Sequence, residues 1–265
     1  MKRNALWLAA ALVSGLFIGA VPLGKSPLYT QVLTPHVLVV VSSACKLLSL
    51  GGGALFAARA LRSFDPKTAT RAGWSLMCVW FCCFFVGQLV LTYYELRTGS
   101  APVPSIGDPF FFLGYAAVII ATVRFIAGYR ASGFAVGATR GHVMSALVAV
   151  VVVLWIGLLV LRPAFHGDAP LATRLVNVGY PALDLVLLVP TVVLLRMAFA
   201  FRGGRLWSVW ATLLIGVLFF TSGDVLFAIP GPITTWLAPV SDLCFLLGYG
   251  FAAAGAGLEG TLLDG

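Results

Sequence analysis

Residues 72–94 read AGWSLMCVWFCCFFVGQLVLTYY and contain no charged side chain. At about 1.5 Å per residue, a helix of this length crosses the hydrocarbon core of a bilayer, which is about 30 Å thick. A membrane β-barrel would instead show short segments of alternating hydrophobicity. We therefore expect an all-α integral membrane protein with eight transmembrane helices. The other seven apolar stretches fall at about 5–22, 36–58, 108–128, 143–161, 175–200, 206–228 and 236–257.

The composition supports the same fold class. Of 265 residues, 60% are hydrophobic and only 10% are charged, whereas a soluble domain carries about 25% charged residues. This balance excludes a water-soluble enzyme and a disordered chain, and it predicts one membrane domain over 1–265. The net charge of +8 is spread between the apolar stretches. The partner we expect is therefore the lipid bilayer, and no nucleic acid.

The loop charges predict the orientation of the helices. With the N-terminus inside, the inner loops hold twelve of the seventeen lysines and arginines, the outer loops hold four, and Lys46 lies within a span. Basic residues concentrate in cytoplasmic loops. We therefore expect a multi-pass protein of a bacterial-type inner (plasma) membrane, with both termini cytoplasmic.

The two halves of the chain resemble each other. We expect two parallel four-helix repeats, over about 1–130 and 138–258, related by a pseudo-two-fold axis along the membrane normal. A shared site would then lie near that axis. The matching positions, at offsets of 134–138 residues, are Lys46 and Asp184, Gln88 and Asp224, Asp108 and Asp242, and Tyr115 and Tyr249.

Polar side chains within the apolar stretches mark the candidate site, because an ionisable group at bilayer depth is costly unless it is paired or hydrated. The predicted topology puts all of them in the outer half of the membrane, so we expect one polar, ligand-binding cavity open to the outside. The candidate ligand-binding residues are Lys46, Gln88, Asp108, Asp184, Asp224, Asp242, Tyr94 and Tyr180.

Some of these residues have a structural interpretation as well. Asp108 and Asp242 are expected at the outer N-termini of their helices, where a carboxylate caps free amides. Lys46 and Asp184 could instead form an ion pair between the halves. Asp224 has no local partner in its apolar helix, which makes it the best single candidate for a functional role.

Other features have simpler interpretations. The five cysteines read as small apolar residues, and the three histidines lie at helix ends or in loops, so we expect no metal site and no cofactor. Gly51-Gly52-Gly53 is typical of close helix packing or a kink. Glu259 is expected in a short tail after the last helix.

The polar motifs resemble those of a known sensory module. Gly87-Gln88, Pro104-Ser105-Ile106-Gly107-Asp108, Tyr180-Pro181-Ala182-Leu183-Asp184 and Ser222-Gly223-Asp224 are similar to the membrane module that precedes bacterial diguanylate cyclase domains. Gln88 stands where that module has aspartate, and Gly107 where it has alanine. The resemblance implies a sensory or ligand-binding protein that takes an unknown small molecule or lipid and acts with a separate signalling partner.

A second resemblance implies an enzyme. The intramembrane lysine and the stretch 216–224, GVLFFTSGD, are similar to the eight-helix lysoplasmalogenases, membrane hydrolases that cleave vinyl-ether lipids. This resemblance implies that Asp224, with Asp184 or Lys46, acts as general acid and base. Our leading prediction is the ligand-binding module and the alternative is the lipid hydrolase. A transporter is disfavoured, because the inner halves of the helices show almost no polar residues.

Overall fold

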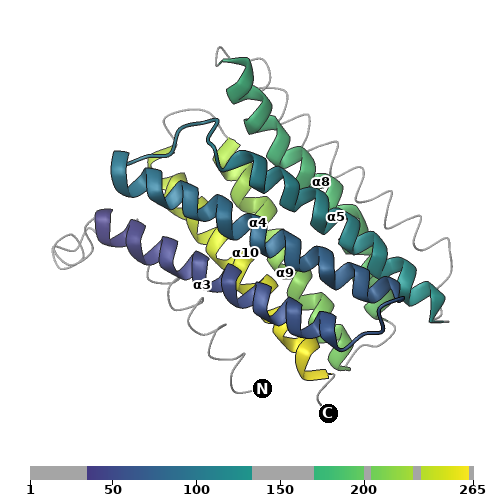
Figure 1. Cartoon of the computed structure of the whole chain (residues 1–265). Coiled ribbons are helices and arrows are strands. Elements are labelled where there is room, and N and C mark those ends of the chain that lie inside the picture. Colours follow the sequence, from purple (N-terminus) through teal and green to yellow (C-terminus); the bar gives the residue numbers. More distant parts are fainter. Residues whose placement is uncertain (1–34, 133–169, 200–203, 229–233, 263–265) are drawn as a thin grey trace.

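The computed structural model describes residues 35–132, 170–199, 204–228 and 234–262 (Figure 1). This part of the chain is all helical and contains no strand. Each of its helices is long and apolar enough to cross a membrane, which confirms the multi-pass membrane character. The expected spans at 5–22 and 143–161 lie outside the described residues. The six described helices are α3 (Pro35–Arg62), α4 (Ala69–Thr98), α5 (Asp108–Ala131), α8 (Leu171–Phe199), α9 (Arg205–Ala228) and α10 (Thr234–Leu262).

Local signals set the ends of α4 beyond the apolar stretch 72–94. At its start, the Thr68 hydroxyl accepts a hydrogen bond from the Arg71 amide at 3.3 Å, as an N-cap residue does. At its end, Gly99 has φ 78°, and its amide donates to the Glu95 carbonyl at 3.0 Å. Glycine adopts this left-handed conformation without the steric cost of a Cβ.

The helices form a closed ring in the order α3, α4, α5, α8, α9, α10, with α10 packed back against α3. The ring has two ends, which we name after their short loops: the 63–68 end joins α3 to α4, and the 99–107 end joins α4 to α5 (Figure 1). Two junctions, α5–α8 and α10–α3, connect the group α3–α5 with the group α8–α10. These junctions position the polar side chains described below.

Aromatic rings fill the centre of the ring. The Phe84 side chain is fully buried, and its ring lies 5.1–6.1 Å, centroid to centroid, from four other rings contributed by three helices. Such edge-to-face and tilted contacts are the favoured geometries of aromatic pairs. The four rings belong to Phe111, Tyr115, Phe220 and Tyr249.

Glycines let these rings approach the neighbouring backbones. A Cβ on Gly114 would lie 2.5 Å from the Phe84 ring, and one on Gly87 would lie 2.8 Å from the Phe111 ring. In α9 and α10, a Cβ on Gly223 would lie 2.9 Å from the Phe245 ring, whereas one on Gly248 would lie 3.2 Å from the Cβ and the backbone nitrogen of Phe220 and from the Gly216 carbonyl oxygen. These pairs occupy matching positions of the two expected repeats, although the duplication itself stays a prediction.

Two expectations, one about the glycines at 51–53 and one about the end of the last helix, have different outcomes. Gly53 does allow close packing, because a Cβ there would lie 2.3 Å from the Phe81 ring, whereas Gly52 meets nothing within 4 Å. The expected tail position of Glu259 is wrong, since α10 continues to Leu262 and Glu259 is buried within it. Small residues at 252–257 keep α10 close against α9, where a Cβ on Gly255 would lie 2.7 Å from Leu213, and the helix continues through them.

Candidate functional site

The most buried polar cluster joins three helices through one hydroxyl. The Tyr115 hydroxyl of α5 lies 2.7 Å from Asp184 Oδ1 of α8 and 2.7 Å from Asp224 Oδ2 of α9. Asp184 is 0% exposed, Tyr115 1% and Asp224 7%. A hydroxyl has one proton to donate. The second short contact therefore requires a proton on one of the two carboxyl groups, which then donates to the hydroxyl oxygen.

A second carboxylate marks the same junction nearer to the 99–107 end. Asp108 is the first residue of α5, and it accepts hydrogen bonds from the Tyr180 hydroxyl of α8 and from the Ser105 amide in the preceding loop. Gly107, which holds the N-cap position, provides no side-chain cap. Asp108 thus ties the 99–107 loop and α8 to α5, rather than capping the first turn of its helix.

The other junction, α10–α3, carries an ion pair. Lys46 of α3 bonds to Asp242 Oδ1 of α10, and the Ser42 hydroxyl, one turn earlier on α3, donates to Asp242 Oδ2. Lys46 is buried, while the Asp242 side chain is 32% exposed. The adjacent Ser43 hydroxyl lies 3.4 Å from Glu95 of α4. At both junctions, an aspartate thus accepts a hydrogen bond from a hydroxyl group of the neighbouring helix.

This geometry corrects two expectations from the sequence: an ion pair between Lys46 and Asp184, and a helix-capping role for Asp242. Lys46 pairs with Asp242 and, among the described residues, not with Asp184, because α3 packs against α10 and not against α8. Asp242 does not lie at a helix N-terminus, since α10 begins eight residues earlier, at Thr234. Its carboxylate therefore bonds to side chains of α3 instead of capping amides.

The two remaining candidate residues, Gln88 and Tyr94, both belong to α4 and contact neighbours in the same helix. Gln88 is buried in α4, and its amide lies 3.4 Å from the Thr92 hydroxyl one turn further along the same helix. Tyr94 is half-buried near the end of α4, where its ring meets Tyr93 edge-on at 5.9 Å. The structure brings together Lys46 with Asp242, Asp108 with Tyr180, and Asp184 with Asp224.

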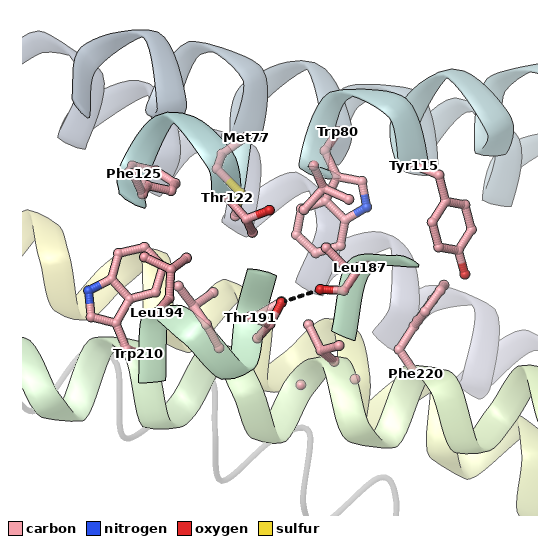
Figure 2. Close-up of a pocket in the computed structure, with 16 residues that line it drawn as sticks. Met77, Trp80, Tyr115, Thr122, Phe125, Leu187, Thr191, Leu194, Trp210 and Phe220 are labelled. Carbon is pink, nitrogen blue, oxygen red and sulfur yellow. Dashed lines mark hydrogen bonds between the residues drawn. The ribbon is translucent and has the colours of Figure 1, made fainter. Parts of the chain in front are cut away.

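A cavity of about 40 Å³ lies inside the ring beside the Tyr115 cluster. Figure 2 shows Tyr115 and Phe220 at one end of it and Phe125 and Trp210 at the other. Its walls are almost entirely apolar, because the Thr191 hydroxyl donates to the Leu187 carbonyl of its own helix at 2.8 Å (Figure 2). The expected polar cavity thus takes another form: the polar groups bond to one another, and the adjoining space is apolar.

Several polar residues of these clusters were not among the candidates from the sequence. Tyr115 and its counterpart Tyr249 both end a Leu-Gly-Tyr motif, and that repetition is the signal that could have selected them. Ser42 lies 138 residues before Tyr180, the same offset as between Lys46 and Asp184. Because Ser42 and Tyr180 each donate a hydroxyl to an aspartate across a junction, the repeat offset could have found Ser42 as well.

Polar groups also occur towards the 63–68 end. Glu259 of α10 is buried there, with Oε2 lacking a hydrogen-bond partner among the described residues. Nearby, the Trp210 indole donates to the Tyr129 hydroxyl at 2.9 Å. The sequence had indicated almost no polar groups at this depth, because Glu259 was assigned to the tail.

Among the described residues, no group of three or more histidine, cysteine, aspartate or glutamate side chains is arranged to hold a metal ion. The five cysteines are free thiols, and Cys82 lies exposed on the outside of the ring. What the site offers chemically is therefore a set of hydrogen-bond acceptors and carboxylates.

Comparison with protein-family models, with curated proteins and with solved structures gives no match for this chain.

Proposed function

We propose that this protein is a multi-pass membrane module that binds a small ligand at the Tyr115 cluster and transmits binding to a separate signalling partner. The observation that supports the proposal is the single hydroxyl that links α5 to both α8 and α9 through two buried carboxyl groups. A ligand that donates hydrogen bonds or positive charge to these carboxyl groups changes the contacts between the helix groups α3–α5 and α8–α10. Binding and helix packing would then be coupled.

The position of the second cluster fits this mechanism. Lys46 and Asp242 hold the other junction of the ring, so the two groups of helices meet at polar contacts on both sides. A rearrangement at the α5–α8 junction changes the geometry of the α10–α3 junction, because the ring is closed. Rigid-body movement of packed helix groups is a common way to convert a local binding event into a signal.

The orientation belongs to the same proposal. We place the 99–107 end on the outside and both termini in the cytoplasm of a bacterial-type inner membrane, on the excess of basic residues in the expected inner loops. The proposed site then lies in the outer half of the membrane. The internal duplication is part of the proposal too, and the matching glycine–aromatic contacts support it.

The test is to identify what the protein carries. The whole chain is purified in lipid nanodiscs, denatured, and its released small molecules are identified by mass spectrometry. We expect a molecule that co-purifies with the wild type and is lost from Asp224→Asn. The matched control is Asp65→Asn, the same change at an exposed loop residue, which should retain it. Identical contents in the wild type and in Asp224→Asn, with both folded, would contradict the proposal.

A lipid hydrolase is the second candidate function, and one observation favours it. Two carboxyl groups that share a hydroxyl can exist with one protonated and one ionised, as general acid–base catalysis requires. Lys46, which the resemblance had implied as a third participant, is bonded to Asp242 instead. Incubation with lysophospholipids, including vinyl-ether forms, tests this candidate. Product formed by the wild type and by Asp65→Asn, but not by Asp224→Asn, would replace the binding-module proposal.

A further inference from the structure

The centre of the ring is tightly packed around Phe84 but hollow next to Phe220. Around Phe84 the packing is so close that a Cβ on Gly114 would lie 2.5 Å from the Phe84 ring. Between Phe220 at one end and Phe125 and Trp210 at the other, five helices leave a cavity of about 40 Å³ (Figure 2). Protein interiors contain few voids larger than a water molecule, because unfilled space forfeits dispersion contacts. A void of this size therefore favours an occupant.

The hydroxyl groups on the wall of this cavity are not available to a guest. The lining residues that carry hydroxyl groups are Tyr115, Thr122 and Thr191. Thr122 and Thr191 each donate to a backbone carbonyl in the preceding turn of their own helix, at 2.7 and 2.8 Å. The Tyr115 hydroxyl bonds to the two carboxyl groups of its cluster. A buried water molecule needs two to four polar partners, so the cavity stays dry and selects an apolar guest.

The volume of the cavity limits the size of that guest. About 40 Å³ corresponds to about three heavy atoms, at roughly 10–15 Å³ for one water-sized atom. Wall residues such as Phe125, Leu194 and Trp210 are themselves buried, so a larger guest would have to displace packed side chains. The class that fits is small apolar molecules, such as dissolved gases and the shortest alkanes.

One wall residue connects the cavity to the polar cluster. The ring of Tyr115 belongs to the wall (Figure 2), while its hydroxyl lies 2.7 Å from both Asp184 and Asp224. A guest that packs against the ring restricts its position, and hydrogen bonds weaken when their distance and angle change. Occupancy of the cavity and the bonds of the cluster are thereby coupled, and such coupling is reciprocal.

We propose that this cavity is a second binding site, which takes an apolar molecule of up to about three heavy atoms and acts on the Tyr115 cluster through the Tyr115 ring. Such a molecule reaches the site from the bilayer, where apolar solutes concentrate because their transfer out of water is favourable. The inference goes beyond the proposed function, and it holds whichever molecule the carboxyl groups bind.

The test is NMR on the whole chain in lipid nanodiscs, with isotope-labelled methionine methyl groups. Met77 lines the cavity, whereas Met197 is buried but is not a wall residue, so Met197 reports guests dissolved elsewhere. The probes are propane and ethanol, which have equal numbers of heavy atoms, and benzene, which has twice as many. We expect propane to shift the Met77 signal saturably and at least about tenfold more tightly than ethanol, while benzene has no saturable effect. Met77→Leu and Met197→Leu assign the two signals.

Two variants change the cavity in opposite directions. Ala252→Leu adds about as many carbon atoms at the wall as the cavity can hold, and it should abolish the effect of propane on Met77. Leu194→Ala enlarges the cavity and should admit benzene, a gain of binding that an unfolded variant could not show. Ala116→Leu is the matched control, since it makes the same change on an exposed face of α5, and it should bind propane as the wild type does.

The action on the polar cluster has its own readout. The protonated carboxyl group of the Asp184–Asp224 pair gives an infrared C=O stretching band, which is identified by its change in Asp184→Asn. Propane should shift this band in the wild type and in Ala116→Leu, but not in Ala252→Leu, because only the last variant has no room for the guest.

The outcomes that contradict the inference are specific to the cavity. Absence of a saturable Met77 shift, an equal shift of Met197, or propane binding that survives Ala252→Leu would overturn it. Saturable binding that leaves the carboxyl band unchanged would overturn the action on the cluster. The proposed function is tested separately through Asp224→Asn, since Asp224 is not a wall residue of the cavity. Either proposal can therefore fail while the other holds.

Discussion

At the scale of single residues, the hydroxyl of Tyr115 has the largest consequence for the site. Within the described part of the chain, it is the one group that is hydrogen-bonded to both Asp184 and Asp224, and all three residues are buried. Buried polar groups are costly when they lose a partner and inexpensive when they keep one. The stability of this part of the ring should therefore depend on one oxygen atom.

Removal of that oxygen by Tyr115→Phe should lower the free energy of unfolding by about 1–3 kcal/mol, because both carboxyl groups lose the hydroxyl to which they are hydrogen-bonded. The measurement is reversible unfolding in mixed micelles or bicelles, followed by circular dichroism. Tyr94→Phe is the matched control, since it removes the same hydroxyl from a half-buried ring outside the cluster. An equal loss in the two variants would show that the hydroxyl of Tyr115 has no special role.

At the scale of helices, α4 and α5 are held together by contacts between glycines and aromatic rings. Gly114 of α5 faces the Phe84 ring of α4, and Gly87 of α4 faces the Phe111 ring of α5. Each helix therefore supplies one glycine and one ring. Phe84 in turn contacts Phe220 of α9 at a centroid distance of 5.5 Å. Small residues let transmembrane helices approach closely, where dispersion and packing replace the hydrophobic effect. The rings beside the proposed site are thereby held in place.

A methyl group at Gly114 should therefore destabilise the protein. In Gly114→Ala, the new Cβ would lie 2.5 Å from two atoms of a ring that is itself fully buried, and overpacking of this kind costs about 1–3 kcal/mol. Gly52→Ala is the control, because a Cβ there meets nothing within 4 Å. It should be neutral or stabilising by up to about 1 kcal/mol through helix propensity. Unfolding free energies of the two variants test this, and equal values would refute the packing argument.

At the scale of the whole molecule, the ion pair between Lys46 and Asp242 closes the ring of helices. It lies at the α10–α3 junction, where the last described helix packs against the first. Its energy should lie between those of exposed and fully buried pairs, because Lys46 is buried while Asp242 is partly exposed. The pair also sets which faces of α3 and α10 meet.

Exchange of the two charges tests that closure. Lys46→Asp and Asp242→Lys should each cost about 1–3 kcal/mol, and the double variant should recover part of the loss. The control is the exchange of Lys46 with Asp184, which should recover nothing, since these residues are not neighbours in the ring. Unfolding free energies in a double-mutant cycle give the coupling. If the Lys46–Asp242 double variant is no more stable than the less stable single variant, the ion pair does not stabilise the closed ring.

The sequence by itself determined that this chain crosses a membrane and which polar residues lie within its spans. Both follow from local properties, because the cost of transferring a helix into hydrocarbon is a sum over consecutive residues. It also identified Lys46, Asp184, Asp224 and their counterparts as residues that need partners. The ends of the helices were less predictable. The last apolar stretch ends at about 257, so the charged Glu259 was assigned to a tail, although the alanines before it favour helix and α10 continues to Leu262.

Only the tertiary structure decided which residues these polar side chains bond to. Lys46 meets Asp242 because α3 packs against α10, and Asp184 meets Tyr115 because α8 packs against α5. The order of helices around the ring depends on how side chains of distant segments interlock, and no stretch of sequence carries that information alone. The same holds for the apolar cavity, whose wall combines residues of α4, α5, α8, α9 and α10. A volume between five helices exists only after they have packed.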